Sequence, residues 1–585
     1  MTEGTKQNRT VTRTGSSLSL IRGPAVVAAS LTGVAFVVGA LPWLSGNDPA
    51  QTVLRARSAE READPQALEA IRDELDLPGD PFSATVDWLS RAATGDFGVS
   101  WVSGAPVAPA LADATGVSAS LAGVAALVAL VTGLTVILPG LVRAVRTGRP
   151  AGRGADTTGA VLAATPDFLL ASVLLSVVAI GLTAAPSAGW QGPEHMVLPA
   201  LALGLPTGGL LSRVLAGALA ATLAENWVRT WRVVGYAPLP LATALMVRTV
   251  AVALPQVLLI FAGLVGSSVI VERVFTIPGL GHMALDGVLS QDLPRVQAAV
   301  AVLVVLGLLV GGVGIAAHRA LLGPALGASG LALAVAVAPR RTRAPQVVGA
   351  VLLAVIAVGL LRDPGAVALG ARLEPPTPQS PMGTDALGRD LWARLSHGAL
   401  ISVGAGVAVS LVALLLGTLF GVAGQRARAG AADVLNALPP VLMGVLTAAV
   451  LGPGLLGAAV AVASVAWIPI AVHARTLAAE VRASGFHQAA IAGGADRVWL
   501  ARRHLVPSVL PAVSRHALMR IPHNTLALAG LGFLGLGAPH DSPEWGAMLA
   551  EGVRYVERAP WTVAVPALGL ALLGVMASLI RTERR

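Results

Sequence analysis

This 585-residue chain lacks several residue types and motifs that carry bond chemistry, and this excludes several classes of enzyme. The chain has no cysteine, so thiol catalysis, disulfides and cysteine-ligated metals are excluded. Its only lysine is Lys6, whereas a P-loop ATPase needs a lysine after its glycines to reach the β- and γ-phosphates. No H-E-x-x-H or G-x-S-x-G motif occurs. The sequence therefore predicts a protein without a catalytic site, metal or bound cofactor of its own.

The histidines suggest one alternative, in which the chain carries a metal ion. Three of the ten, His282, His397 and His540, are expected near the outer ends of apolar runs. Such residues could relay a nickel ion, yet no pair of them has the spacing of metal ligands. A nickel or metal-chelate cargo stays open as an alternative.

Two polar segments interrupt the apolar sequence in a related way. Each segment has three residues that define the pattern, then three residues of any type, then a glycine. The two glycines are 259 residues apart. One such segment alone is an ordinary solvated helix with a C-terminal glycine, but a repeat at matching places indicates two related halves. The defining residues are Arg229, Thr230, Trp231 and Gly235 in the first copy, and Gln488, Ala489, Ala490 and Gly494 in the second.

The elements that position these segments are membrane-spanning helices. The chain is 55% hydrophobic and 12% charged, whereas a soluble protein carries about 25% charged residues. Long uncharged apolar runs recur, which predicts an all-α polytopic membrane protein. The predicted spans are 24–44, 117–141, 158–184, 195–220, 246–270, 296–317, 345–361, 396–423, 433–452, 455–473, 506–532 and 561–580.

Arginine placement predicts the orientation of these spans. The net charge is +9, and the basic residues lie at the ends of apolar runs. This placement favours the positive-inside effect over nucleic-acid binding. Segment 45–116 has twelve acidic residues against five arginines and is predicted to lie outside, with a helix that begins near Pro65. Both termini are then expected in the cytoplasm. Segment 325–338 is apolar but short, and we interpret it as an extension of the sixth helix or an interfacial piece.

These observations divide the chain into two six-helix halves. A cytoplasmic tail covers residues 1–23, and a cytoplasmic linker covers 321–344. The first half is 24–320, with the external segment 45–116 and a cytoplasmic loop at 221–245. The second half is 345–585, with its matching loop at 474–505.

The two loops and their flanking stretches resemble those of a known family. Both loops resemble the E-A-A-x-x-x-G loop of bacterial ABC importer permeases, and flanking stretches resemble the dipeptide, oligopeptide and nickel permeases. "NDPAQTVL", "GDFGVS" and "VERVFTIPGLG" are similar to the B-type subunit, whereas "MGTDALGRDLWARL" and "GFLGLGAPHDSPEWGAMLAEG" are similar to the C-type subunit. The chain thus looks like a fusion of two subunits in the type I importer fold.

The resemblance implies a transport mechanism without chemistry in this chain. Each loop would form a coupling helix that docks on one of two cytoplasmic ATPase domains, which use ATP and Mg²⁺. An external solute-binding protein would deliver peptides or a related solute to the outer mouth of a bacterial plasma-membrane protein. The glutamate of the motif is replaced by Arg229 and Gln488, and Trp231 is the least expected residue.

Outer residues are candidates for binding-protein docking or an outer gate. Alternatively, the stretch 382–395 could be an amphipathic helix on the membrane surface, with Trp392 at the interface. The pathway itself is expected to be lined by apolar and small residues, because charges in the spans are sparse. The docking or gate candidates are Asp48 (before Pro49), Asp96, Glu272, Asp385, Arg389, Asp390 and Trp545.

Two rival functions fit parts of the sequence. A secondary transporter also has two six-helix halves, but it predicts ionisable residues at mid-span and no paired glycine-ended loops. A degenerate permease or membrane scaffold is suggested only by the altered first loop. Co-purification with an ATPase pair separates all three.

Overall fold

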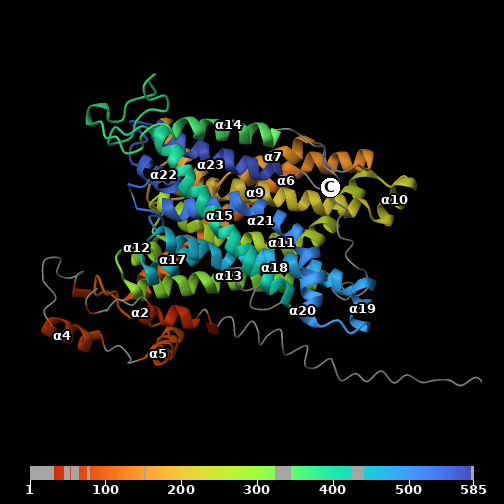
Figure 1. The fold of residues 1–585 in the computed structure, drawn as a ribbon, viewed down its shortest axis with the longest axis horizontal. Helices are drawn as coiled ribbons and strands as arrows, with labels where there is room; N and C mark the ends of the chain where they lie inside the picture. Colours follow the sequence, from red (N-terminus) through yellow and green to blue (C-terminus); the bar gives the residue numbers. More distant parts are fainter. Residues whose placement is uncertain are drawn as a thin grey trace, which may run out of the picture.

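The described part of the chain is helical. The computed structural model describes residues 32–33, 35–44, 50, 53–54, 65–75, 80–149, 153–322, 344–423, 440–539 and 541–580. Within these ranges no strand occurs beyond two isolated β-bridges, and the helices form one layered bundle (Figure 1). The tail 1–23, segment 325–338, Asp48 and His540 lie outside the described residues.

Thirteen long or bundle-forming elements of the described ranges make up the two halves. Those of the first half are α6 (Val107–Thr147), α7 (Arg153–Ala164), α8 (Asp167–Leu174), the π-helix η1 (Leu175–Gly181), α9 (Glu194–Leu223), α11 (Pro238–Val274) and α13 (Leu293–Leu322). Those of the second half are α14 (Ala344–Gly359), α15 (Leu391–Ala423), α17 (Pro440–Leu451), α18 (Leu455–Ala483), α21 (Val506–Phe533) and α23 (Trp561–Ile580).

Short helices lie at the two ends of the bundle (Figure 1). At one end are α10 (Asn226–Val233), α19 (Gly485–Ala492), α20 (Arg497–Leu500) and the π-helix η4 (Ala501–Leu505). At the other are α2 (Leu41–Leu44), α4 (Pro65–Leu75), α5 (Pro81–Ala93), α12 (Leu280–Leu289) and α22 (Trp545–Val553). A short 3₁₀ helix, η3, covers Leu369–Ala371.

The membrane-spanning character of the chain is confirmed. Five described helices are long and apolar enough to cross a bilayer, and a bent pair makes a sixth. Of five shorter apolar helices, four coincide with other predicted spans, and the fifth, Pro238–Leu254, is the first part of α11, whose second part is already counted. The helix α21 matches predicted span 506–532 but is not among the apolar helices, because it carries Arg515, His516, Arg520 and His523. Charges are sparse in the predicted spans, and this helix holds two of them, Arg515 and Arg520.

One predicted span is not continuous. Span 158–184 is broken into α7 and α8, which meet at an angle of 85°. Pro166 is the N-cap of α8, where its ring cannot continue the helix that ends at Ala164. The bend lets α7 pack along α9 while α8 enters the core between the halves.

Close helix contacts repeat in both halves. Gly204 and Gly208 of α9 lie against α6, where an added Cβ would stand 2.6 Å from Val128 and Thr132 atoms. In the second half Gly417 and Gly421 of α15 lie against α18 in the same way. Glycines four residues apart allow backbones to approach closely in a membrane, where lipid tails compete with any apolar contact.

The external segment folds as small helices. The helix α4 begins at Pro65, as its sequence predicts, and α5 follows after Asp80. The Asp80 carboxylate accepts the Phe82 and Ser83 backbone N–H groups, both at 2.9 Å. This cap satisfies two donors that the first helical turn leaves unpaired.

Candidate functional site

The two motif loops adopt the same backbone conformation. The helices α10 and α19 both have eight residues, and each follows an extended residue. That residue is Glu225 with φ −70° and ψ 142° in the first half, and Ser484 with φ −71° and ψ 147° in the second. Figure 1 shows both helices at one end of the bundle, beyond the long helices that lead into them.

Both helices end in a left-handed turn at the motif glycine. The φ angles are 77° at Gly235 and 84° at Gly494, a region that L-residues with a Cβ rarely adopt. The backbone N–H after each glycine donates to a carbonyl five residues back, from Tyr236 to Trp231 at 2.9 Å and from Ala495 to Ala490 at 3.0 Å. The glycines are thus explained by backbone geometry at the helix C-terminus.

The first loop is held by an ion pair and by stacked aromatic rings. Arg248 of α11 donates from Nε to Glu225 Oε1 at 3.0 Å, and Trp227 Nε1 donates to Oε2 of the same carboxylate at 2.6 Å. Trp231 stacks on Tyr236 with ring centroids 4.2 Å apart and meets Trp227 edge-on at 5.1 Å. Trp231 therefore packs the loop against itself, which accounts for an aromatic residue at this position.

The second loop is held by an amide. Gln488 donates from Nε2 to the backbone carbonyl of Arg482 at 2.7 Å, in the last turn of α18. Helix C-termini leave such carbonyls without partners, and only a group with a hydrogen can satisfy them. A glutamate at this position could not donate when ionised, so the local geometry favours glutamine.

Apolar side chains are exposed on both short helices and on the turns after them. Val233 is 84% exposed and Val234 is 74% exposed in the first loop, while Phe486 and Ile491 are 54% and 48% exposed in the second. Exposed apolar groups clustered at one end of a protein indicate an interaction surface. Arg229 and Gln488 are also exposed, whereas Trp231 is half-buried.

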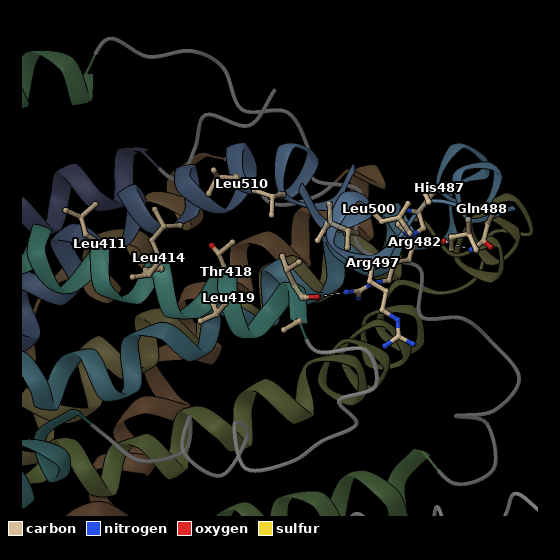
Figure 2. Close-up of a pocket in the computed structure, with 18 residues that line it drawn as sticks. Leu411, Leu414, Thr418, Leu419, Arg482, His487, Gln488, Arg497, Leu500 and Leu510 are labelled. Atoms are coloured by element: carbon tan, nitrogen blue, oxygen red, sulfur yellow. Dashed lines mark hydrogen bonds between the residues drawn. The ribbon is translucent and has the colours of Figure 1, made fainter. Parts of the chain in front are cut away.

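A large cavity borders the second loop (Figure 2). Its volume is about 1080 Å³, and its walls come from α15, α18, α19, α20, η4 and α21. Leucines such as Leu414 and Leu419 line the bundle side, and Arg482, His487, Gln488 and Arg497 line the end near α19 (Figure 2). Ala489 and Ala490 are not among its lining residues, so α19 presents a different face to the cavity.

At the opposite end a serine–glutamate bridge joins an outer short helix to a long helix in the first half. Ser118 Oγ of α6 donates to Glu272 at 2.8 Å and accepts the Leu280 N–H at 2.8 Å. Glu272 accepts the His282 N–H at 3.0 Å. The bridge thus binds the first and third N–H groups of α12.

The second half repeats this bridge with residues from other sequence positions. Ser402 Oγ of α15 donates to Glu544 at 3.0 Å and accepts the Trp545 N–H at 3.0 Å. Glu544 accepts the Ala547 N–H at 2.8 Å. Burial raises the pKa of Glu544, although hydrogen bonds from Gly546, Ala547 and Ser402 oppose this shift. Burial is the larger influence.

Several predicted outer residues are buried and do not form a docking surface in this conformation. Glu272 and Trp545 are 0% exposed, and Asp385 is 2% exposed. Asp385 accepts from Arg389 at 2.7 Å and from Arg394 at 2.5 Å, and Arg394 also donates to Glu551 at 2.9 Å. The gate role stays a prediction for these residues.

The remaining outer residues have local partners. Asp390 pairs with Arg362 at 2.5 Å, and Asp96 accepts the Gly98 N–H at 2.9 Å within an exposed turn. The interfacial-helix alternative for 382–395 is wrong, because this stretch is a turn up to Asp390 and α15 begins at Leu391. Trp392 donates to the Val355 carbonyl of α14 at 2.8 Å.

Sequence reasoning missed the partners of these residues. No spacing in the sequence links Ser118 to Glu272, or Ser402 to Glu544, because the pairs are 154 and 142 residues apart. Arg394 and Glu551 were missed for the same reason. The charged residues of α21 were visible in the sequence as Arg515 and Arg520 inside a predicted span. Ionisable residues inside a span are functional candidates by default.

Comparison with known proteins adds independent information. The profile of a family described as "Binding-protein-dependent transport system inner membrane component" matches residues 136–326 and again 409–582. The probable D,D-dipeptide transport system permease protein DdpC of Escherichia coli is 40% identical over 221 residues, which are 36% of this chain and 74% of that protein. The nickel transport system permease protein NikC of Escherichia coli is 34% identical over 222 residues, 37% of this chain and 80% of that protein.

A third relative has a similar extent. The dipeptide transport system permease protein DppC of Alkalihalophilus pseudofirmus is 34% identical over 210 residues, 34% of this chain and 69% of that protein. The repeated family match falls once in each half of the bundle.

Proposed function

Since the chain belongs to the family of binding-protein-dependent transport system inner membrane components and carries two copies of its domain, we propose that it forms the whole translocation pathway of one ABC importer. It is a membrane permease of the peptide and nickel transport group. Two cytoplasmic ATPase domains would use ATP and Mg²⁺, and this chain would hydrolyse nothing itself.

The observation that carries this proposal is the matched pair of loop helices. The helices α10 and α19 have equal length, the same entry geometry and the same left-handed glycine, and both lie at one end of the bundle. A pair of ATPase domains needs two equivalent docking points. We infer that Arg229, Thr230, Trp231 and Gly235, together with Gln488, Ala489, Ala490 and Gly494, form these points.

The same proposal sets the orientation and the outer partner. The end with α10 and α19 would face the cytoplasm, together with both termini, in a bacterial plasma membrane. The opposite end, with α4, α5, α12 and α22, would receive an external solute-binding protein. Arginine-rich loops at the first end and the acidic segment 45–116 at the other support this direction.

Short peptides are the proposed cargo. Two of the three relatives above are named for dipeptides, and the third is named for nickel. Nickel stays the second candidate cargo, and one relative is named for it.

The test is reconstitution of the full chain with its ATPase subunits in proteoliposomes. We expect Val233→Asp and Ile491→Asp each to abolish ATPase co-purification and peptide uptake, because a carboxylate would replace an apolar docking contact. Leu369→Asp is the matched control, since Leu369 is 64% exposed in an outer loop. Normal ATPase binding in both loop variants would contradict the proposal.

A further inference from the structure

A cavity of about 300 Å³ lies between the two halves of the bundle. One wall is formed by Leu259, Gly263 and Ser267 of α11, in the first half. The other walls come from α17, α18 and α21 in the second half. Most of the lining is apolar, so any polar group in it stands out.

The polar side chains of the second-half wall lie on one face of α21. Arg520, His523 and Asn524 are three and four residues apart, which places them side by side on a helix. Asn524 is 1% exposed and donates from Nδ2 to Ser410 Oγ of α15 at 2.9 Å. This bond orients the amide at the cavity wall.

The first-half wall has a carboxylate behind it. Ser267 lines the cavity, and its hydroxyl donates to the Leu264 carbonyl at 3.1 Å, while its side chain lies beside the Asp167 carboxylate at the start of α8. The Asp167 carboxylate also accepts the Phe168 N–H at 2.9 Å. The cavity therefore has a guanidinium on the second-half side and a carboxylate one side chain away on the first-half side.

The fold does not require these charges. The helices α11 and α21 are related by the same interval of 259 residues as the motif glycines, since they end at Val274 and Phe533. At this interval Arg520 and His523 correspond to Phe261 and Leu264. The first half forms its equivalent helix with apolar residues at these positions, so the helix itself does not need a polar face there.

We propose that this cavity binds a short zwitterionic peptide during transport, with the peptide carboxylate at Arg520 and His523 and its ammonium group near Ser267 and Asp167. This inference rests on the proposed function and adds the chemistry of the solute. Charge-assisted hydrogen bonds from a guanidinium to a carboxylate are among the strongest in proteins. A volume near 300 Å³ is at the small end of about 300–1,000 Å³ for ligand sites, which favours dipeptides or tripeptides.

The test measures direct binding, without ATPase or binding protein. Labelled dialanine, its C-terminal amide and N-acetyl-dialanine are equilibrated by dialysis with the full chain in lipid nanodiscs. We expect dialanine to bind more tightly than either blocked form by about tenfold. Arg520→Gln should abolish the preference for the free carboxylate, and Asp167→Asn the preference for the free amine.

The matched control is Arg515→Gln. Arg515 lies on the same helix but is exposed and outside the cavity lining, so its loss should leave both preferences intact. Equal binding of all three probes to the unmodified chain, no binding of any at millimolar concentration, or an unchanged preference in Arg520→Gln would each overturn the inference. ATPase co-purification and the coupling of transport to ATP hydrolysis are measured in separate experiments. This inference can therefore fail while the proposed function holds.

Discussion

The two halves of the chain share backbone geometry at their loop helices and differ in the side chains that hold it. In the first half Glu225, Arg248 and stacked aromatic rings surround α10. In the second half Gln488 binds the end of α18 directly. The helix ends and the glycine turns of the two loops have matching geometry. The two halves therefore share the backbone shape at this end of the bundle. The side chains that maintain the shape differ between the halves.

The outer ends differ in a further way. Both halves have a serine–glutamate bridge to a short outer helix, but only the second adds a cluster, among the described residues, in which buried Asp385, Arg389 and Arg394 meet the partly exposed Glu551. The first half instead has a half-exposed pair, Arg273 and Asp286, at 3.4 Å. Burial decides how much each pair matters, since water screens the exposed one.

The largest effect is expected from breaking the buried cluster. Arg394→Met leaves Asp385 and Glu551 with one arginine instead of two, which should lower the free energy of unfolding by about 3–5 kcal/mol. The matched variant in the first half, Arg273→Met, should cost only about 0–1 kcal/mol. Thermal unfolding in detergent measures both, and similar shifts would contradict the comparison.

A β-branched residue at either motif glycine should be the next most severe change. Gly235→Val and Gly494→Val force a side chain into a left-handed conformation, with a strain of about 1–3 kcal/mol. No atom lies within 4 Å of the added Cβ, so the penalty is in the backbone alone. We expect loss of transport-coupled ATP hydrolysis with normal membrane insertion in both variants.

The control for these glycine variants is Gly485→Ala. Gly485 begins α19, has no positive φ and also has open space around its Cβ. Its coupling should stay normal. If only one of the motif glycines proved sensitive, the two loops would not be equivalent docking points.

One substitution in each loop tests how much the contacts that hold that loop contribute. Gln488→Glu replaces the donor to the Arg482 carbonyl with a carboxylate, which should weaken the attachment of α19 by about 1 kcal/mol. Glu225→Gln should cost less, because the amide oxygen that replaces the carboxylate can still accept from Arg248 or Trp227. ATPase rates at saturating ATP compare the two, and a larger loss in Glu225→Gln would reverse the order.

The smallest effect concerns pH. Burial raises the pKa of Glu544 above its ordinary value of 4.5, so the folded protein keeps a proton that the unfolded chain has released. The stabilising contribution is present below pH 4.5 and is lost as pH rises through the folded-state pKa. Melting temperatures measured from pH 4.5 upward should fall with pH in the unmodified protein. Glu544→Gln should flatten this fall, and an equal slope would contradict the assignment.

Much of the local structure followed from the sequence because local rules decide it. The start of α4 at Pro65 needs only a residue that suits the first helical turn. The turns at Gly235 and Gly494 need only a residue that tolerates positive φ. Local rules did not indicate what Arg515 and Arg520 of α21 contact, because those contacts depend on neighbouring helices.

The sequence by itself determined that the chain spans a membrane, that it consists of two related halves and that each half carries one glycine-ended loop. These properties depend on hydropathy, on repeat spacing and on backbone preferences within a few residues. Only the tertiary structure decided which carboxylates are buried, which serines bridge to them and which distant charges pair within the second half. Those contacts join residues far apart in the chain, so their energies depend on packing that no local pattern records.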